Sequence, residues 1–266
     1  MRHQISGDGP PIVLLHGIPG SGASWQAVAD RLRGDHRVVV PDLIGFGMSP
    51  RSRHLEDVGM EGQAAALELA LDKAAIAGVV LVGHDFGGPV ALSLLRRRPD
   101  LVSALALLAT NTFTDTPIPL PIRAVRWPLV GRLAARVLFS RPSLALMLRQ
   151  GSSIPLDGSA AIGDAGQRRA IRTIFAASLR ELARRYATVE ETLGDVHVPT
   201  LVAWGDQDPF FPIAQAERTA AAIPGADLRI YEGCGHFIPE ERPSALAAGL
   251  RTLAEFATRP AVCTTG

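Results

Sequence analysis

Short runs of apolar, mostly β-branched or aliphatic residues alternate with helical patterns along most of the chain. Apart from Arg229 in the last of them, the runs are continuously apolar rather than alternating, as expected for strands that are covered on both faces. Six strands are predicted in this way: 12–15, 38–40, 79–82, 104–108, 201–204 and 228–231. The helices predicted between and after them are 23–32, 59–75, 88–97, 213–222 and 243–258. This order predicts an α/β fold with a mostly parallel central sheet flanked by helices.

One long segment interrupts the alternation. Residues 111–198 contain no good strand pattern, are rich in Arg, Pro and Leu, and show helical patterns at 131–139, 144–150 and 168–186. A helical insertion at this place is expected to form a lid over the carboxyl edge of the sheet, where such folds bind ligands. The alternative is a helical subdomain with no role at the site. We therefore expect three parts: a core (1–110 and 199–258), a helical lid (111–198) and a flexible tail (259–266).

Composition narrows the class of protein. The 266 residues suit one large domain or a domain with an insertion, and the net charge of +1 argues against a nucleic-acid partner. Cys234 and Cys263 offer no disulfide framework or metal spacing, so we expect no metal site. The polar N-terminus has no signal-peptide pattern, and no apolar run approaches the roughly 18–20 residues of a membrane span. These features predict a cytoplasmic protein with a small-molecule substrate and no membrane partner, and they leave its oligomeric state open.

The segment Val80–Gly88 carries the strongest chemical signal. It reads as a strand, a Gly-His-Asp-Phe-Gly turn and the start of a helix. Glycines flank the central residue because this turn is sharp and crowded, and the central residue is exposed at the head of the helix, as in a nucleophile elbow. Here the central residue is Asp85 rather than Ser. The alternative is an ordinary glycine-rich turn in which Asp85 caps the helix.

Four further motifs follow predicted strands. They are HGIPG (16–20), PDLIGFG (41–47), WGDQD (204–208) and GCGH (233–236). Together with GHDFGG (83–88), they resemble the α/β-hydrolase fold superfamily, aspartate-nucleophile branch, over nearly the whole chain. The resemblance implies an α/β-hydrolase fold with a helical lid inserted after the sixth strand. The family normally has thirty or more residues before its H-G loop, whereas His16 leaves room for one short strand.

The resemblance also implies the roles of individual residues. Asp85 corresponds to the nucleophile, Asp208 to the acid and His236 to the base, and the backbone N–H groups of Ile18 and Phe86 correspond to the oxyanion hole. Asp206 is an alternative acid that fits a turn better. Asn111 and Asp115 are a more distant alternative, because they follow the 104–108 strand, where some relatives place the acid.

An aspartate nucleophile restricts the reaction. Attack of a carboxylate on an ester would give an anhydride, whereas attack on an sp3 carbon gives an alkyl ester on the enzyme. Asp85 therefore argues against an esterase, lipase or peptidase and for the opening of an epoxide or the expulsion of a halide. His236, oriented by Asp208, would then activate the water that hydrolyses the ester. This mechanism requires no metal and no organic cofactor.

The choice within this branch depends on residues near the site. Haloalkane dehalogenases usually place a halide-binding Trp, and fluoroacetate-type dehalogenases an Arg, directly after the nucleophile, and Phe86 supplies neither. Epoxide hydrolases usually present two lid tyrosines, whereas this lid contains one, Tyr186. The usual position of the second falls near 178–181 rather than at Tyr186, and packing is the alternative role of Tyr186. Trp127 could line the pocket or pack the lid, and the apolar lid suggests an apolar substrate. The sequence thus predicts an epoxide hydrolase; a haloalkane or haloacid dehalogenase is the first alternative, and a ligand-binding, lyase or cyclase use of the fold is the second.

Overall fold

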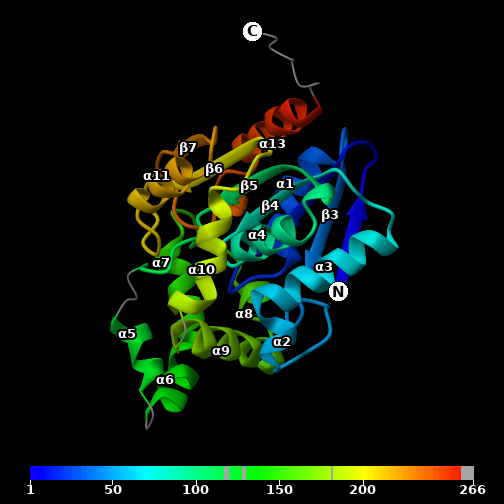
Figure 1. Ribbon diagram of the computed structural model, residues 1–266. Coiled ribbons are helices and arrows are strands. Elements are labelled where there is room, and N and C mark those ends of the chain that lie inside the picture. Colours follow the sequence, from blue (N-terminus) through cyan, green and yellow to red (C-terminus); the bar gives the residue numbers. More distant parts are fainter. Residues whose placement is uncertain (117–119, 128–129, 181, 259–266) are drawn as a thin grey trace.

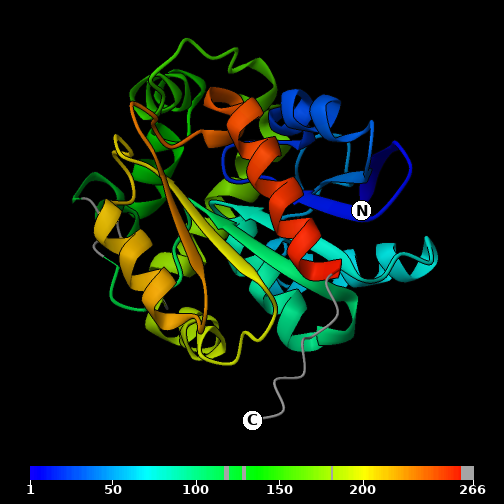
Figure 2. The same cartoon turned by 90° about the horizontal axis from the view of Figure 1, so that it is seen from above.

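A seven-stranded sheet lies at the centre of the molecule, with helices on both faces (Figures 1 and 2). The computed structural model describes residues 1–116, 120–127, 130–180 and 182–258. The strand order is β1-β3-β2-β4-β5-β6-β7, and β1 is the one antiparallel strand among the described residues. The predicted tail, 259–266, lies outside the described residues.

All six predicted strands are present. Their bounds, with those of the short first strand, are β1 (Arg2–Ser6), β2 (Pro11–Leu15), β3 (Arg37–Asp42), β4 (Val79–His84), β5 (Val102–Leu108), β6 (Thr200–Gly205) and β7 (Asp227–Tyr231). Every residue of β4 and β6 is buried, whereas β1 and β7 at the two edges are largely exposed. The continuous apolar runs therefore mark the centre of the sheet, as expected for strands covered on both faces.

The core helices divide between the two faces. They are η1 (Gly22–Trp25), α1 (Gln26–Leu32), α2 (Leu55–Val58), α3 (Met60–Lys73), α4 (Gly87–Arg97), η2 (Pro99–Leu101), α11 (Ile213–Ala222), α12 (Ile238–Glu241) and α13 (Pro243–Thr258). Helices α1 and α13 pack together, and α3 and α4 pack together. Right-handed crossovers place α1 on the opposite face from α3 and α4, because the chain moves one way across the sheet after β2 and the other way after β3 and β4.

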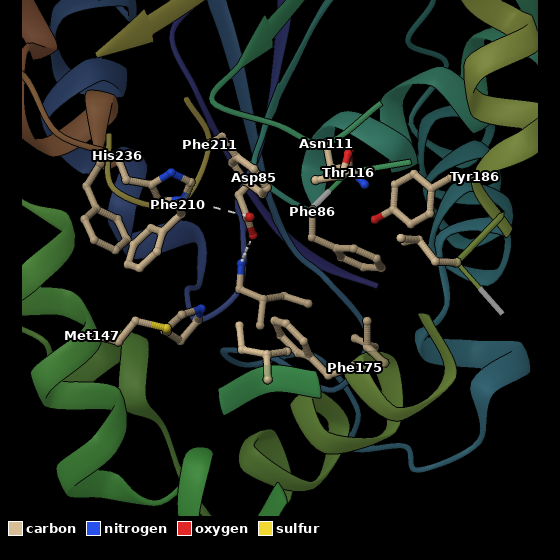
Figure 3. Close-up of a pocket in the computed structure, with 16 residues that line it drawn as sticks. Asp85, Phe86, Asn111, Thr116, Met147, Phe175, Tyr186, Phe210, Phe211 and His236 are labelled. Carbon is tan, nitrogen blue, oxygen red and sulfur yellow. Dashed lines mark hydrogen bonds and ion pairs between the residues drawn. The ribbon is translucent and has the colours of Figure 1, made fainter. Parts of the chain in front are cut away.

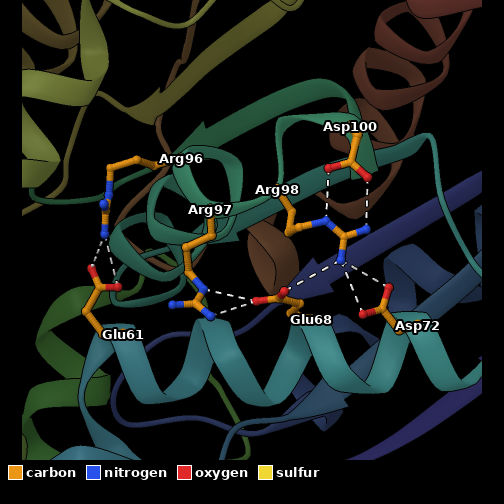
Figure 4. Close-up of polar contacts among 7 residues, drawn as sticks. All are labelled: Glu61, Glu68, Asp72, Arg96, Arg97, Arg98 and Asp100. Carbon is orange, nitrogen blue, oxygen red and sulfur yellow. Dashed lines mark hydrogen bonds and ion pairs between the residues drawn. The ribbon is translucent and has the colours of Figure 1, made fainter.

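Ionic contacts join α3 to α4 along their exposed sides (Figure 4). Arg97 pairs with Glu68 at 2.8 Å, and Arg98 pairs with both Asp72, at 3.2 Å, and Asp100, at 2.8 Å. The pairing lowers the pKa of Asp100, mainly through its hydrogen bond from Arg98. These contacts hold the helix that follows the elbow against its neighbour.

The insertion between β5 and β6 is helical in its described parts. Its elements are α5 (Leu120–Arg123), η3 (Ala124–Arg126), α6 (Gly131–Leu138), α7 (Arg141–Gly151), α8 (Ser159–Ile162), α9 (Ala165–Arg180) and α10 (Leu182–Leu193). In Figure 1, α5, α6, α8 and α9 lie beyond one end of the strands, on the side away from α13. The insertion was expected after the sixth strand. It follows the fifth strand, β5, because a single strand, β1, comes before β2 in this chain. No helix in the described part of the chain is long and apolar enough to cross a membrane.

Candidate active site

The turn between β4 and α4 holds Asp85 in a strained conformation. Its φ is +50°, a region that L-residues with a side chain rarely adopt. Several contacts fix this conformation: the Asp85 N–H donates to the Leu108 carbonyl at 3.0 Å, and the Thr110 hydroxyl donates to the Asp85 carbonyl at 2.5 Å. A Cβ on Gly83 would overlap the Gly87 carbonyl. The sequence Gly83–Gly88 therefore forms the sharp elbow that its glycine spacing predicts.

The three predicted triad side chains meet above the carboxyl edge of the sheet, and Figure 3 shows two of them, Asp85 and His236. His236 Nε2 lies 3.8 Å from Asp85 Oδ1, and His236 Nδ1 lies 2.8 Å from Asp208 Oδ2. The other Asp208 oxygen accepts backbone N–H bonds from Phe210 and Phe211 at 2.8 and 3.1 Å. Asp208 is thus held on one oxygen by backbone, and its second oxygen orients the imidazole.

Burial and charge act in opposite directions on these groups. Burial disfavours protonated His236, but the charge and hydrogen bond of Asp208, helped by the charge of Asp85, outweigh it and raise the pKa of His236. Burial also works against the charge on Asp208, but its pairing with His236 outweighs this and lowers the pKa of Asp208. Burial raises the pKa of Asp85, although His236 and two backbone N–H groups oppose that rise. The site therefore concentrates two carboxylates and one imidazole in a nearly dry environment.

The two predicted oxyanion donors already face the Asp85 carboxylate. The Ile18 N–H donates to Asp85 Oδ2 at 2.6 Å, and the Phe86 N–H is near enough to this carboxylate to lower its pKa. The loop that carries Ile18 approaches closely, because a Cβ on Gly17 would lie 2.5 Å from the Asp85 Cβ. His16 fixes the same loop: its Nε2 accepts the Leu43 N–H at 3.1 Å, so its Nδ1 donates to the Gly17 carbonyl at 2.9 Å.

A cavity of about 180 Å³ opens beside Asp85 Oδ1 and His236 (Figure 3). Most of its wall is apolar, and the polar side chains on it are few. The residues that line it are Ile18, Pro19, Asp85, Phe86, Asn111, Thr116, Ile122, Met147, Ile174, Phe175, Leu182, Tyr186, Phe210, Phe211, His236 and Phe237. An apolar pocket with a few convergent polar groups is the typical form of a small-molecule site.

Three polar side chains face the cavity opposite His236. Tyr186 is buried on α10 and, in Figure 3, its hydroxyl points toward the interior of the cavity. Burial, together with the charge of Asp85, raises the pKa of Tyr186, so its hydroxyl stays protonated at neutral pH. Asn111 Oδ1 accepts from the Phe113 N–H at 3.1 Å and from the Thr116 hydroxyl. With Oδ1 occupied in this way, the Asn111 amide N–H₂ remains as the donor toward Tyr186, consistent with the hydrogen bond that lowers the pKa of the phenol.

Three other predicted candidates lie away from the cavity. Trp127 is 58% exposed and is not among the side chains that line it. Asp206 accepts the Cys234 N–H at 3.2 Å, which is the turn role that its position suggests. Asp115 pairs with Arg218 at 2.6 Å on the surface.

Glu241 is a residue of this site that the sequence analysis missed. Its buried carboxylate accepts N–H bonds from Gly235 at 2.9 Å, Phe237 at 3.1 Å and Ser153 at 2.9 Å, so it fixes the His236 loop and joins it to the insertion. The one available signal was an acidic residue a turn beyond the GCGH motif. The aromatic wall of Phe210 and Phe211 was also missed, although both residues directly follow the Asp208 loop.

Comparison with known proteins agrees with this architecture. The family model described as the alpha/beta hydrolase fold matches residues 10–243. Haloalkane dehalogenase 2 of Mycobacterium bovis is 30% identical, over 92% of this chain and 87% of its own length. A cis-3-alkyl-4-alkyloxetan-2-one decarboxylase of Shewanella oneidensis is 27% identical, over 90% of this chain and 80% of its own length. A solved epoxide hydrolase superposes with a TM-score of 0.76, at 23% identity, over 96% of this chain and 93% of that one. The chain belongs to the α/β-hydrolase fold family and is a hydrolase of that fold.

Proposed function

We propose that this hydrolase opens small apolar epoxides to diols through an alkyl ester on Asp85. The observation that carries the proposal is the position of Asp85 Oδ2, which already accepts the Ile18 N–H at 2.6 Å. An acyl-transfer enzyme needs these donors for the carbonyl oxygen of its substrate. Here they hold an oxygen of the nucleophile itself. That arrangement suits a reaction in which the acyl carbon that water attacks is Cγ of Asp85 and the substrate contributes no carbonyl group.

In the first step, Asp85 Oδ1 attacks a ring carbon of the epoxide, and the C–O bond of the ring breaks. The released oxygen takes the proton of the Tyr186 hydroxyl, which faces the same cavity. Oδ2 becomes the carbonyl oxygen of the ester and keeps its hydrogen bond from Ile18, with the Phe86 N–H close by.

In the second step, His236 Nε2 takes a proton from water, and the hydroxide adds to Asp85 Cγ. Negative charge develops on Oδ2, where the Ile18 and Phe86 N–H groups stabilise it. The bond from Cγ to Oδ1 then breaks, and the alkoxide takes the proton held by His236. The carboxylic acid left on Asp85 carries the second proton of the water and passes it to the Tyr186 phenolate, so both groups return to their resting states. The diol leaves with Oδ1, and the oxygen of water stays on Asp85.

The cavity indicates the size of the substrate. An engineered cavity of roughly 150 Å³ in another protein binds benzene, so about 180 Å³ accommodates a ring or short alkyl chain bearing the epoxide. The aromatic walls of Phe86, Phe175 and Phe210 favour apolar groups.

A haloalkane substrate is the second candidate, because a curated relative at 30% identity is named a haloalkane dehalogenase. The same ester on Asp85 would form as the halide leaves. Against it, no tryptophan is among the described residues that line the cavity, and the position after Asp85 is Phe86. The hydroxyl of Tyr186 is better suited to a leaving oxygen, which needs a proton, than to a halide, which does not.

Trapping the ester tests the proposal. In His236→Gln the ester should form but not hydrolyse, so intact-protein and peptide mass spectrometry should find the substrate mass added to the Asp85 peptide. Asp85→Asn is the matched control and should gain nothing. The panel contains small epoxides, haloalkanes and p-nitrophenyl esters. An adduct with haloalkanes only would favour the second candidate. If the wild type turned a substrate over and His236→Gln gave no adduct with that substrate, the covalent mechanism would be overturned.

A single turnover of the wild type in H₂¹⁸O gives an independent check. We expect ¹⁸O on Asp85 and none in the diol, because the product leaves with Oδ1. Label in the diol after one turnover would mean that water attacks the substrate directly.

A further inference from the structure

Charge is distributed unevenly between the insertion and the rest of the chain. Residues 111–198 contain twelve arginines and seven carboxylate side chains, a net charge of +5, whereas the remaining residues carry −4. The near-zero total therefore conceals a basic lid on an acidic core. Such asymmetry within one chain indicates an anionic partner on the basic side.

Four of these arginines gather around a hollow of about 400 Å³ between α6 and α9. Arg132 and Arg136 come from α6, and Arg169 and Arg172 from α9. Within the described residues, none of the four forms an ion pair with a carboxylate. Partial burial and the charges of the neighbouring arginines lower the pKa of Arg172. Like charges held together without counter-charges are expected to bind an external anion.

An exposed apolar stripe runs along the same helix. Leu133 is 64% exposed and Val137 is 60% exposed, and they are preceded by Val130, at 46%, and Trp127, at 58%. Their four-residue spacing places Leu133 and Val137 on one side of α6, while Gly131 and Ala135 are buried, and Val130 and Trp127 are exposed just before the helix. Because α6 packs against the protein through Gly131 and Ala135, its other side, which carries the stripe, faces away from the core.

We propose that this surface binds a bilayer that contains anionic lipids. It consists of the apolar stripe (Trp127, Val130, Leu133, Val137) and the arginine cluster (Arg132, Arg136, Arg169, Arg172), and we call it the lid face. Arginines that reach lipid headgroups, beside apolar side chains that enter the acyl boundary, are the usual features of a helix that lies in a membrane interface. The expectation of no membrane partner rested on the lack of a spanning segment, which does not bear on binding at the surface.

Other occupants fit the lid face less well. A second copy related by two-fold symmetry would place the arginine cluster against itself or close to it. A nucleic acid or an acidic polypeptide would neutralise the arginines but would leave Leu133 and Val137 in water. A bilayer with anionic headgroups satisfies both halves of the surface. This inference does not depend on the proposed reaction, although Ile122 of the neighbouring α5 lines the cavity and an apolar substrate can dissolve in a membrane.

The three tryptophans allow a direct measurement. Trp25 and Trp204 are fully buried, so a change in tryptophan emission on lipid binding would come from Trp127. Phosphatidylcholine vesicles mixed with phosphatidylglycerol should bind the full chain in a flotation assay, shift its emission to the blue and release it at high salt. Pure phosphatidylcholine vesicles should neither bind the chain nor shift its emission, and inorganic phosphate should not shift the emission.

Variants separate the two halves of the surface. Arg132→Gln with Arg136→Gln should lower the partition coefficient about thirtyfold, whereas the charge-matched pair Arg31→Gln with Arg33→Gln on α1 should leave it unchanged. Leu133→Gln with Val137→Gln should abolish the blue shift. All should retain wild-type turnover of a soluble substrate without lipid, which also checks folding. Any one of four results would overturn the proposal. They are binding to neither kind of vesicle, equal binding to both kinds, an equal loss of binding in the α1 control, and equally strong binding to DNA or polyglutamate.

Discussion

The protonation of His236 is coupled to the charge of Asp85 across 3.8 Å. In the resting enzyme, the Asp85 carboxylate is one of the charges that raise the pKa of His236. An ester at Asp85 is neutral, so this contribution disappears when the first step is complete. In the proposed reaction, the first step therefore prepares the base for the second, because ester formation removes a charge that keeps His236 protonated just before His236 must accept a proton from water.

This coupling predicts two different midpoints for one imidazole. NMR titration of the resting enzyme should place His236 above the ordinary value of 6.5. The single-turnover rate of ester hydrolysis should fall as the pH drops through a lower midpoint, because only neutral imidazole acts as the base. Asp208→Asn, which removes the main charge that raises the pKa, should lower both midpoints. Coincident midpoints for the resting enzyme and the hydrolysis step would contradict the coupling.

Tyr186 should distinguish the two classes of leaving group. We expect Tyr186→Phe to slow ester formation from an epoxide about 10²- to 10³-fold, because the leaving oxygen loses its proton donor. Ester formation from any haloalkane that reacts should change little. The rate of adduct formation in the His236→Gln background measures this step alone.

The chain offers one matched control for that experiment. Its second tyrosine, Tyr231, is equally buried but lies on β7 away from the cavity, so Tyr231→Phe should leave adduct formation unchanged. Equal effects of Tyr186→Phe on epoxides and haloalkanes would assign Tyr186 to packing instead.

At this scale the sequence predicted the geometry of the triad better than the walls of the cavity. Asp85, Asp208 and His236 each sit in a short motif after a strand, where local spacing determines position. Trp127 illustrates the limit: its side chain is exposed, and sequence could not decide between pocket and surface because the lid helices carry apolar residues on more than one side. Glu241 acts through contacts with a segment 88 residues away, a pairing that no local pattern contains.

At the scale of elements, the elbow depends on how closely α4 approaches β4. A side chain at Gly83 would overlap the Gly87 carbonyl, and backbone there cannot move without displacing Asp85. Gly83→Ala should therefore lower the free energy of unfolding by about 2–3 kcal/mol, measured by urea denaturation. Gly34→Ala is the control, since nothing lies within 4 Å of its added Cβ, and it should change stability by less than about 0.5 kcal/mol. Equal stability of the two variants would mean that the close approach is not a constraint.

Strands were easier to predict than helix boundaries. Each buried strand is a short apolar run ended by a glycine, a proline or a polar residue, and all six appear where predicted. The helix expected at 59–75 is α3, and the short helix α2, which was not predicted, precedes it and is separated from it by Gly59 in an extended conformation. The helix expected at 168–186 corresponds to α9 and α10, with residue 181 between them outside the described part. Periodicity detects an amphipathic face but places the ends of a helix only to within a few residues.

At the scale of the whole molecule, the two parts of the chain contribute different functions to one cavity. The core supplies Asp85, His236 and the Phe210–Phe211 wall, whereas the segment from Asn111 to Tyr186 supplies half of the lining residues. We infer that the core determines the reaction and the insertion determines which substrates fit. The order of elements predicted this arrangement, because the insertion follows a strand whose carboxyl end faces the site.

Enlarging the cavity from the lid side tests this division. Met147 lines the cavity from α7, so Met147→Ala should raise kcat/KM for bulkier epoxides about tenfold relative to small ones. The mass of the trapped ester should still lie on Asp85 in the His236→Gln background, because the core is unchanged. Met48→Ala is the matched control, since Met48 is 80% exposed and lies outside the cavity. If both methionine variants gave the same preference for large substrates, or if Met147→Ala moved the adduct away from Asp85, the insertion would not be a separate determinant of substrate size.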